Sequence, residues 1–105
     1  LSVERWVEIT STTPARMFGL YPKKGAIAPG SDADIVIYDP HGHTSIGYEK
    51  THHMNMDHSA WEGWVIDGKV DTVFSRGTVL IDNDQYVGRK GHGKYIKRGL
   101  SQYLV

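Results

Sequence analysis

Two histidines that flank a glycine, His41 and His43, are the first residues whose spacing suggests chemistry. Imidazole nitrogens this close in sequence can share one transition metal, and zinc accepts such ligands. A metal site also needs further ligands and an ordered second shell that orients them, and the sequence shows neither beside this pair. The pair follows Asp39-Pro40, a turn signal, so we interpret both histidines as surface loop residues.

A denser cluster contains His52, His53, Asp57 and His58. Imidazole and carboxylate groups within a few residues could bind zinc adventitiously. The segment 41–59 around them is polar and shows little periodicity, which is typical of a loop. We therefore interpret these side chains as loop and surface residues, and we assign no metal ligand in this chain.

Asp32 and Asp34 could act as a pair of carboxylates, because alternation around Ala33 at the start of a strand makes both face one way. Turn or capping roles are the better interpretation at such a position. Ser31 has no adjacent base that would activate it as a nucleophile. The glycines do not form a phosphate loop, because no Gly-Lys-Ser/Thr follows a strand. We assign no catalytic and no cofactor-binding residue.

Composition narrows the class of protein further. The 105 residues suffice for one small domain, and 12 basic residues balance 12 acidic ones. That balance argues against nucleic acid and anionic membranes as partners. The chain has no cysteine, which excludes disulfides and fits a reducing compartment, so we expect a cytoplasmic location. No apolar run approaches the roughly 20 residues that span a bilayer.

The elements that position these residues begin with two short helices. Ser2 is a good N-cap, and the spacing of Val3, Trp6 and Val7 predicts a helix with one buried face. The β-branched stretch 10–13 predicts a break, after which Thr13 caps a second helix that starts at Pro14. That helix should turn Ala15 and Phe18 inward and stop at Gly19.

Strands should follow. Residues 20–32 predict a loop and residues 33–38 a buried strand that ends at Asp39-Pro40. Residues 61–66 predict a short strand before a turn at Asp67-Gly68, with Trp61 and Trp64 as core anchors rather than a stacking platform. Strands at 70–75 and 78–81 should form a hairpin through Arg76-Gly77. A turn at residues 82–84 should lead to a last strand at 85–87.

Four segments carry a family resemblance: Pro-Ala-Arg-Met-Phe-Gly-Leu at 14–20, Gly-Ser-Asp-Ala-Asp at 30–34, Thr-His-His-Met-Asn-Met-Asp at 51–57 and Gly-His-Gly-Lys-Tyr-Ile-Lys-Arg at 91–98. The second is shared by many amidohydrolases. The third and fourth resemble the dihydropyrimidinase and hydantoinase branch of that superfamily. One departure is Thr13, where relatives often carry Asn. Thr caps a helix nearly as well, so no role is put in doubt.

The resemblance implies an α+β piece at the C-terminal end of a larger hydrolase. Residues 1–20 would be the last helices of a (β/α)8 TIM-like barrel, residues 21–87 part of a small β-sandwich, and residues 88–105 a docking tail. Such enzymes resemble one another in opening dihydropyrimidine or hydantoin rings to N-carbamoyl amino acids at a binuclear zinc centre with a carboxylated lysine. Their ligands precede residue 2, so this chain alone should be inactive. The His-x-His ligand pair of the family lies far upstream, which sets His41 and His43 apart from it.

The expected partners are the remainder of the parent chain and other copies of it, in a homo-oligomer such as a tetramer assembled through the tail. The tail 95–105 is too apolar to stay free in solvent. Two alternatives remain open. One is a non-catalytic scaffold of the dihydropyrimidinase fold. The other is an independent β-rich binding module with a histidine metal site, which would purify with stoichiometric metal.

Overall fold

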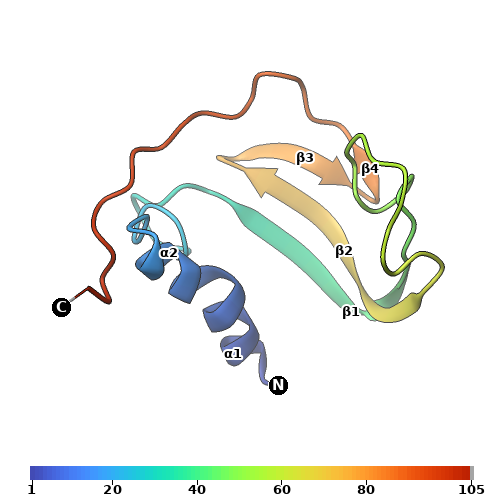
Figure 1. Ribbon diagram of the computed structural model, residues 1–105, viewed down its shortest axis with the longest axis horizontal. Helices are drawn as coiled ribbons and strands as arrows, with labels where there is room; N and C mark the ends of the chain where they lie inside the picture. The colour runs from blue at the N-terminus through green and yellow to red at the C-terminus, as the bar shows by residue number, and fades with distance from the viewer. Residues whose placement is uncertain (105) are drawn as a thin grey trace. The chain divides into compact units, whose positions relative to one another are not determined.

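The computed structural model describes residues 1–104. They form a small α+β structure that divides into two compact units. The first unit contains residues 1–34 and 91–105, and the second contains residues 35–90. Figure 1 shows the helical segment of the first unit and the antiparallel sheet of the second. The finer assignment of residues 1–20 to a barrel, 21–87 to a sandwich and 88–105 to a docking tail stays a prediction.

The first unit opens with a helical segment of three parts. They are α1 (Val3–Val7), the π-helical turn η1 (Glu8–Thr12) and α2 (Thr13–Met17). Ser2 caps α1 as predicted, since its hydroxyl accepts a hydrogen bond from the backbone amide of Arg5 at 3.2 Å. No helix within residues 1–104 has the length and apolarity needed to cross a bilayer.

The predicted break at residues 10–13 is wrong, because the backbone continues through them in a widened turn. Pro14 has no amide proton and would collide with the carbonyl of the fourth preceding residue in a regular helix. The π-helical turn before Pro14 removes that conflict. Thr13 is therefore inside the helix, with φ −63° and ψ −48°, and does not act as a fresh cap.

Burial in this segment differs from the prediction. Ala15 is buried, at 6% exposure, as predicted. Phe18 is 54% exposed, and Val3, Trp6 and Val7 are exposed as well, so the prediction of a buried face on α1 is wrong for this chain. Gly19 ends the segment at φ +69°, in the left-handed region that glycine enters at little cost.

The second unit is a four-stranded antiparallel sheet in the order β1-β2-β3-β4. Its strands are β1 (Ile35–Ser45), β2 (Val65–Ser75), β3 (Thr78–Asp82) and β4 (Gln85–Tyr86). Both predicted hairpin turns are confirmed. Arg76 and Gly77 have φ +46° and +78°, and Asn83 and Asp84 have φ +46° and +66°. Positive φ at both central residues matches the right-handed twist of the flanking strands.

The first strand is longer than predicted, and the strands predicted at residues 61–66 and 70–75 are one strand, β2, which begins at Val65. β1 does not stop at Asp39-Pro40, and Asp67-Gly68 lies inside β2 rather than in a turn. The register shifts once between Ile37 and Tyr38 and again after Asp39, which lies opposite Lys69. Pairing resumes at His43 opposite Asp67, so residues 40–42 bulge opposite Gly68. A proline without an amide proton is tolerated at a bulge on an edge strand, which is the position of β1.

The strand at residues 35–38 is not buried. Val36, Ile37 and Tyr38 are 56%, 48% and 39% exposed. The second unit contains one sheet, and a single layer cannot cover both of its own faces. The same reason applies to Trp61 and Trp64, which are 53% and 61% exposed, so their prediction as core anchors is wrong for this chain.

Candidate functional site

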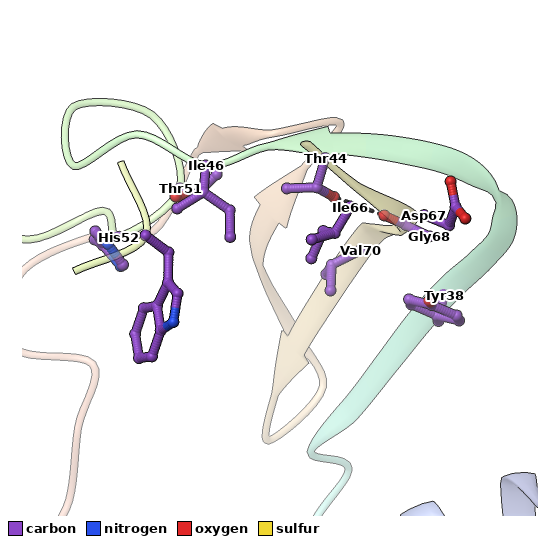
Figure 2. Close-up of a pocket in the computed structure, with 10 residues that line it drawn as sticks. Tyr38, Thr44, Ile46, Thr51, His52, Ile66, Asp67, Gly68 and Val70 are labelled. Carbon is purple, nitrogen blue, oxygen red and sulfur yellow. Dashed lines mark hydrogen bonds between the residues drawn. The ribbon is translucent and has the colours of Figure 1, made fainter. Parts of the chain in front are cut away.

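A cavity of about 300 Å³ lies in the second unit, where β1, β2 and the connection between them meet (Figure 2). Figure 2 shows Tyr38 and His52 at opposite ends of the view, with Ile66 and Val70 between them. The lining is mostly apolar, with a few hydroxyl, imidazole and carboxylate groups. Its members are Tyr38, Thr44, Ile46, Thr51, His52, Trp61, Ile66, Asp67, Gly68 and Val70.

The strand geometry creates this cavity. Gly68 adopts φ +94° opposite the bulge, and a Cβ atom at this position would lie 1.6 Å from the hydroxyl oxygen of Tyr38. The Tyr38 side chain therefore approaches β2 closely because position 68 carries no side chain. The cavity wall at this end depends on that contact.

The hydroxyls of the cavity bind backbone. The Thr44 hydroxyl donates to the Gly68 carbonyl at 2.7 Å, and the Thr51 hydroxyl donates to the Gly47 carbonyl at 3.0 Å. These bonds fasten the cavity walls to the strand and the loop. A serine-protease type of arrangement needs a hydroxyl whose proton is held by a base, and neither threonine is so placed.

His52 is the one pocket residue with an unexplained polar atom. Its Nε2 is buried and has no hydrogen-bond partner among the described residues. A buried nitrogen without a partner costs free energy. The sequence analysis interprets His52 as a loop residue on the surface with no unpaired group. The buried, unpaired Nε2 shows that this part of the interpretation is wrong. Nothing in its local pattern distinguishes it from His53, because the burial arises from the fold of the connection.

The His41–His43 pair lies within β1 and not in a loop, because the bulge lets the strand continue past Pro40. The His41 amide donates to the Asp39 carboxylate at 2.9 Å. His43 Nδ1 lies 3.2 Å from Asp67 Oδ1 across the two strands, and both side chains are largely exposed. Both histidines therefore lie on the surface, as predicted, but in a strand rather than in the predicted loop.

The residues of the second histidine cluster are dispersed. His58 Nδ1 and Asp57 Oδ1 lie 2.7 Å apart in solvent, whereas His52 turns into the cavity. Within residues 1–104, no group of three or more His, Cys, Asp or Glu side chains is arranged to hold a metal ion. These residues therefore do not form a metal centre.

The carboxylate pair in the first unit belongs to an ion network. Lys24 contacts both Asp32, at 2.9 Å, and Asp34, while Lys23 reaches Asp32 at 3.0 Å. The pKa of Asp32 is lowered, first by the hydrogen bond from Lys24 and then by that from Lys23. Desolvation acts to lower the pKa of Lys24, yet the two carboxylates together raise it. Both carboxylates are charge partners, so neither is poised as a general acid.

Ser31 completes this loop. Its hydroxyl donates to the Pro22 carbonyl at 2.7 Å, and the Asp32 amide donates to the Lys23 carbonyl at 2.8 Å. The serine therefore has a structural bond in the loop. The Oδ2 atom of Asp32 is buried and lies 2.9 Å from the Lys24 ammonium nitrogen. The loop 22–34 is thus closed by charge and by backbone bonds.

These features describe a class of protein. It is an α+β chain that carries the sequence motifs of a hydrolase family and whose hydroxyl and carboxylate groups at the candidate sites contact backbone or lysine. Residues 1–80 match the amidohydrolase family pattern, and the chain belongs to that family. It is 62% identical over 101 residues to the D-hydantoinase of Streptomyces coelicolor, an alignment that spans 96% of this chain and 21% of that protein. The D-phenylhydantoinase of Escherichia coli is 43% identical over 98 residues, or 93% of this chain and 21% of the relative.

Solved structures agree with this placement. The crystal structure of D-hydantoinase from Bacillus sp. AR9 matches with a TM-score of 0.86 and 48% identity, over 96% of this chain and 22% of that one. Dihydropyrimidinase from Brevibacillus agri matches with a TM-score of 0.85, also at 48% identity, over 96% of this chain and 22% of that one. The resemblance to the hydantoinase branch is therefore confirmed. The chain spans about a fifth of the length of the relatives it matches.

Proposed function

We propose that the protein containing this chain hydrolyses cyclic amides, opening hydantoin or dihydropyrimidine rings to N-carbamoyl amino acids. The observation that carries the proposal is the 62% identity to a D-hydantoinase over nearly the whole chain. A TM-score of 0.86 against a D-hydantoinase structure supports it. The match to a dihydropyrimidinase structure supports the second class of ring.

The geometry of the site suggests a proposed division of labour, in which some parts of the protein carry out the chemistry and this chain supports the structure. The described residues offer no metal-binding group and no activated nucleophile, so in this proposal they shape and stabilise the enzyme. Residues elsewhere in the full-length protein would hold the metal, which we propose to be a binuclear zinc centre with a carboxylated lysine. Bound there, the metal would supply a hydroxide nucleophile and polarise the amide carbonyl.

A direct test is turnover by the full-length protein. Hydantoin and dihydrouracil are supplied, and the N-carbamoyl product and bound metal are measured. The double variant His41→Ala with His43→Ala serves as a control, because both imidazoles lie on the exposed strand β1. We expect ring opening in both proteins, with equal metal content. Absence of turnover in the native protein would favour the scaffold alternative, and loss of both metal and activity in the variant would contradict the division of labour.

We further propose that the exposed apolar surface of this chain packs against the rest of the full-length protein. Val36 and Ile37 on β1 are 56% and 48% exposed. Surface of this kind marks an interaction site in a protein that is stable in water. Size-exclusion chromatography of the 105-residue piece with a dye for apolar surface tests this, and a monomer that binds no dye would contradict it.

The assembly proposal concerns residues 88–105. This basic, aromatic segment would contact a neighbouring subunit of a cytoplasmic homo-oligomer, as its five cationic residues between 89 and 98 and its exposed Tyr95 suggest. Deletion of residues 88–105 should lower the subunit count more than it changes metal content. An unchanged oligomer, measured by light scattering, would count against this role.

A further inference from the structure

The last residues of the first unit run back along the end of its helical segment, as Figure 1 shows for the red part of the chain near α2. Two backbone hydrogen bonds join the two parts. The Gly99 amide donates to the Gly19 carbonyl at 2.8 Å, and the Gln102 amide donates to the Arg16 carbonyl at 3.0 Å. The last carbonyls of a helix have no partner inside the helix, and the Arg16 carbonyl otherwise accepts only a long bond from the Gly19 amide, at 3.4 Å, so these two bonds complete the pairing of the helix end.

The crossing at Gly19 and Gly99 is close. A Cβ atom on Gly19 would lie 2.1 Å from the Gly99 carbonyl oxygen and 2.5 Å from its carbonyl carbon. Both of these are backbone atoms, which cannot rotate away as the end of a side chain can. Gly19 therefore has two reasons to lack a side chain: its φ of +69° and this contact.

A side-chain contact continues the junction. The Arg16 guanidinium lies over the Tyr21 ring, 4.7 Å from its centre, and it also interacts with the side chain of Tyr103. Cation–aromatic contacts of this kind favour a fixed arrangement of the groups. The aromatic ring on the loop and the one near the end of the chain thus meet at one arginine of α2.

The apolar side chains of this segment contribute little burial. Leu100 and Leu104 are 84% and 71% exposed, and a hollow of about 370 Å³ lies between this segment and the end of the helix, beside Met17 and Phe18. The attachment therefore depends on backbone hydrogen bonds and the arginine contact rather than on a packed core. An attachment of this kind opens at a lower free energy than a core element does.

We propose that residues 99–103 form a reversible intramolecular strap that closes the carboxyl end of the helical segment, with the Gly19–Gly99 crossing as its fastening point. The strap makes residues 91–98 a loop held at both ends, by the chain at Lys90 and by the crossing at Gly99. Order in the strap then requires no second subunit, which distinguishes this role from the assembly role proposed above. When the strap opens, the Gly19 carbonyl loses the bond from Gly99, the Arg16 carbonyl keeps only the 3.4 Å bond from the Gly19 amide, and the last helical turn frays.

Amide hydrogen exchange of the full-length protein tests the strap with two matched glycine variants. Gly19→Ala adds both left-handed strain and the 2.1 Å collision, whereas Gly30→Ala adds similar strain at φ +90° with no atom within 4 Å of the new Cβ. We expect the Gly99 and Gln102 amides to exchange about 30-fold faster in Gly19→Ala, the effect of losing two backbone hydrogen bonds, and to be unchanged in Gly30→Ala.

A second pair of amides reports whether opening of the strap also opens the last turn of the helical segment. Leu20 and Tyr21 both donate to the Ala15 carbonyl, at 2.8 and 3.1 Å, and so report opening of the last turn. Faster exchange there together with the strap supports the proposal. Equal exchange in both glycine variants at Gly99 and Gln102 would overturn it, and so would loss of the strap with native protection at Leu20 and Tyr21.

A second pair of variants keeps the test decisive if Gly19→Ala does not fold. Gln102→Pro removes the amide that donates to the Arg16 carbonyl, while Gln102→Ala shortens the same side chain and keeps that amide. Faster exchange at Leu20 and Tyr21 in the first variant alone supports the strap, and equal exchange in both overturns it. Neither readout depends on ring-opening activity, so failure of the strap and failure of the proposed function are separable.

Discussion

The contact between Gly25 and Ala15 yields the sharpest quantitative prediction. Ala15 is the one buried apolar residue among residues 1–104, and Gly25 in the following loop packs directly on it. A Cβ atom on Gly25 would lie 2.6 Å from the Ala15 Cβ and 3.2 Å from the Ser11 carbonyl oxygen. The Thr12 hydroxyl donates to the Gly25 carbonyl at 2.8 Å, so the loop cannot simply move away without losing that bond.

Gly25→Ala should therefore cost free energy in two ways. A residue other than glycine at φ +84° costs about 1–2 kcal/mol, and overpacking against Ala15 costs a further ~1–3 kcal/mol. Gly30→Ala carries only the first cost, because its φ is +90° and nothing lies within 4 Å of the added Cβ. The difference between the two variants, about 1–3 kcal/mol, isolates the packing contribution.

Native-state amide exchange at Leu20, which donates to the Ala15 carbonyl at 2.8 Å, measures local opening of this junction in the full-length protein. Ala15→Gly should rescue Gly25→Ala, because it removes the colliding atom at a helix-propensity cost of about 1 kcal/mol. A coupling free energy of at least ~0.5 kcal/mol in the double-mutant cycle is expected. Equal losses in Gly25→Ala and Gly30→Ala, with no rescue, would show that the reasoning is wrong.

Three further predictions concern other buried or charged groups. His52→Phe should leave local stability unchanged or raise it by up to about 1 kcal/mol, because it removes a buried nitrogen that has no partner; slower amide exchange in the surrounding loop would show the gain. Thr44→Val should cost about 1–2 kcal/mol by leaving the Gly68 carbonyl unpaired, whereas Thr44→Ser, which keeps the hydroxyl, should cost less on urea titration. The lowered pKa of Asp32, caused chiefly by the hydrogen bond from Lys24, predicts stabilisation that is present above the unfolded pKa of about 4 and lost as pH falls through the folded value. Asp32→Asn should remove this acid dependence from exchange in the loop.

Turns were the most predictable features of the fold, because their residue types fix backbone angles locally. Arg76-Gly77 and Asn83-Asp84 both form the expected tight turns with positive φ. Ser2 and Gly19 likewise mark the two ends of the helical segment. Each of these predictions needs only the few residues around the position and no knowledge of what packs against it.

The errors arose where pairing or packing overrides a local signal. Pro40 reads as the end of a strand, yet pairing with β2 resumes at His43 and the proline is accommodated in a bulge. The threonines before Pro14 read as a break, yet a widened helical turn avoids the proline clash at smaller cost than separating the helices. In both cases the chain keeps its hydrogen bonds by a local distortion that residue types do not specify.

Nothing in the sequence indicates the burial of the His52 Nε2 atom. That burial depends on the path of residues 46–64 between two strands that are far apart in sequence. The same path spreads the histidine cluster of residues 52–58, because His52 enters the cavity while Asp57 and His58 pair in solvent. Residues that are close in sequence are thus separated in space by the path of the loop.

The low burial of apolar side chains distinguishes this chain from a domain that folds by itself. A domain of this size depends on burying apolar side chains, and Ala15 is the only apolar side chain that is buried within residues 1–104. The turns, the ion network at Lys24 and the strap fix the backbone through polar contacts, which specify geometry but add little net stability. The apolar faces of β1 and α1 are exposed within these residues. We propose that they gain their stabilisation from the rest of the hydrolase, in which case folding of this chain would depend on the parts of the protein that carry the chemistry.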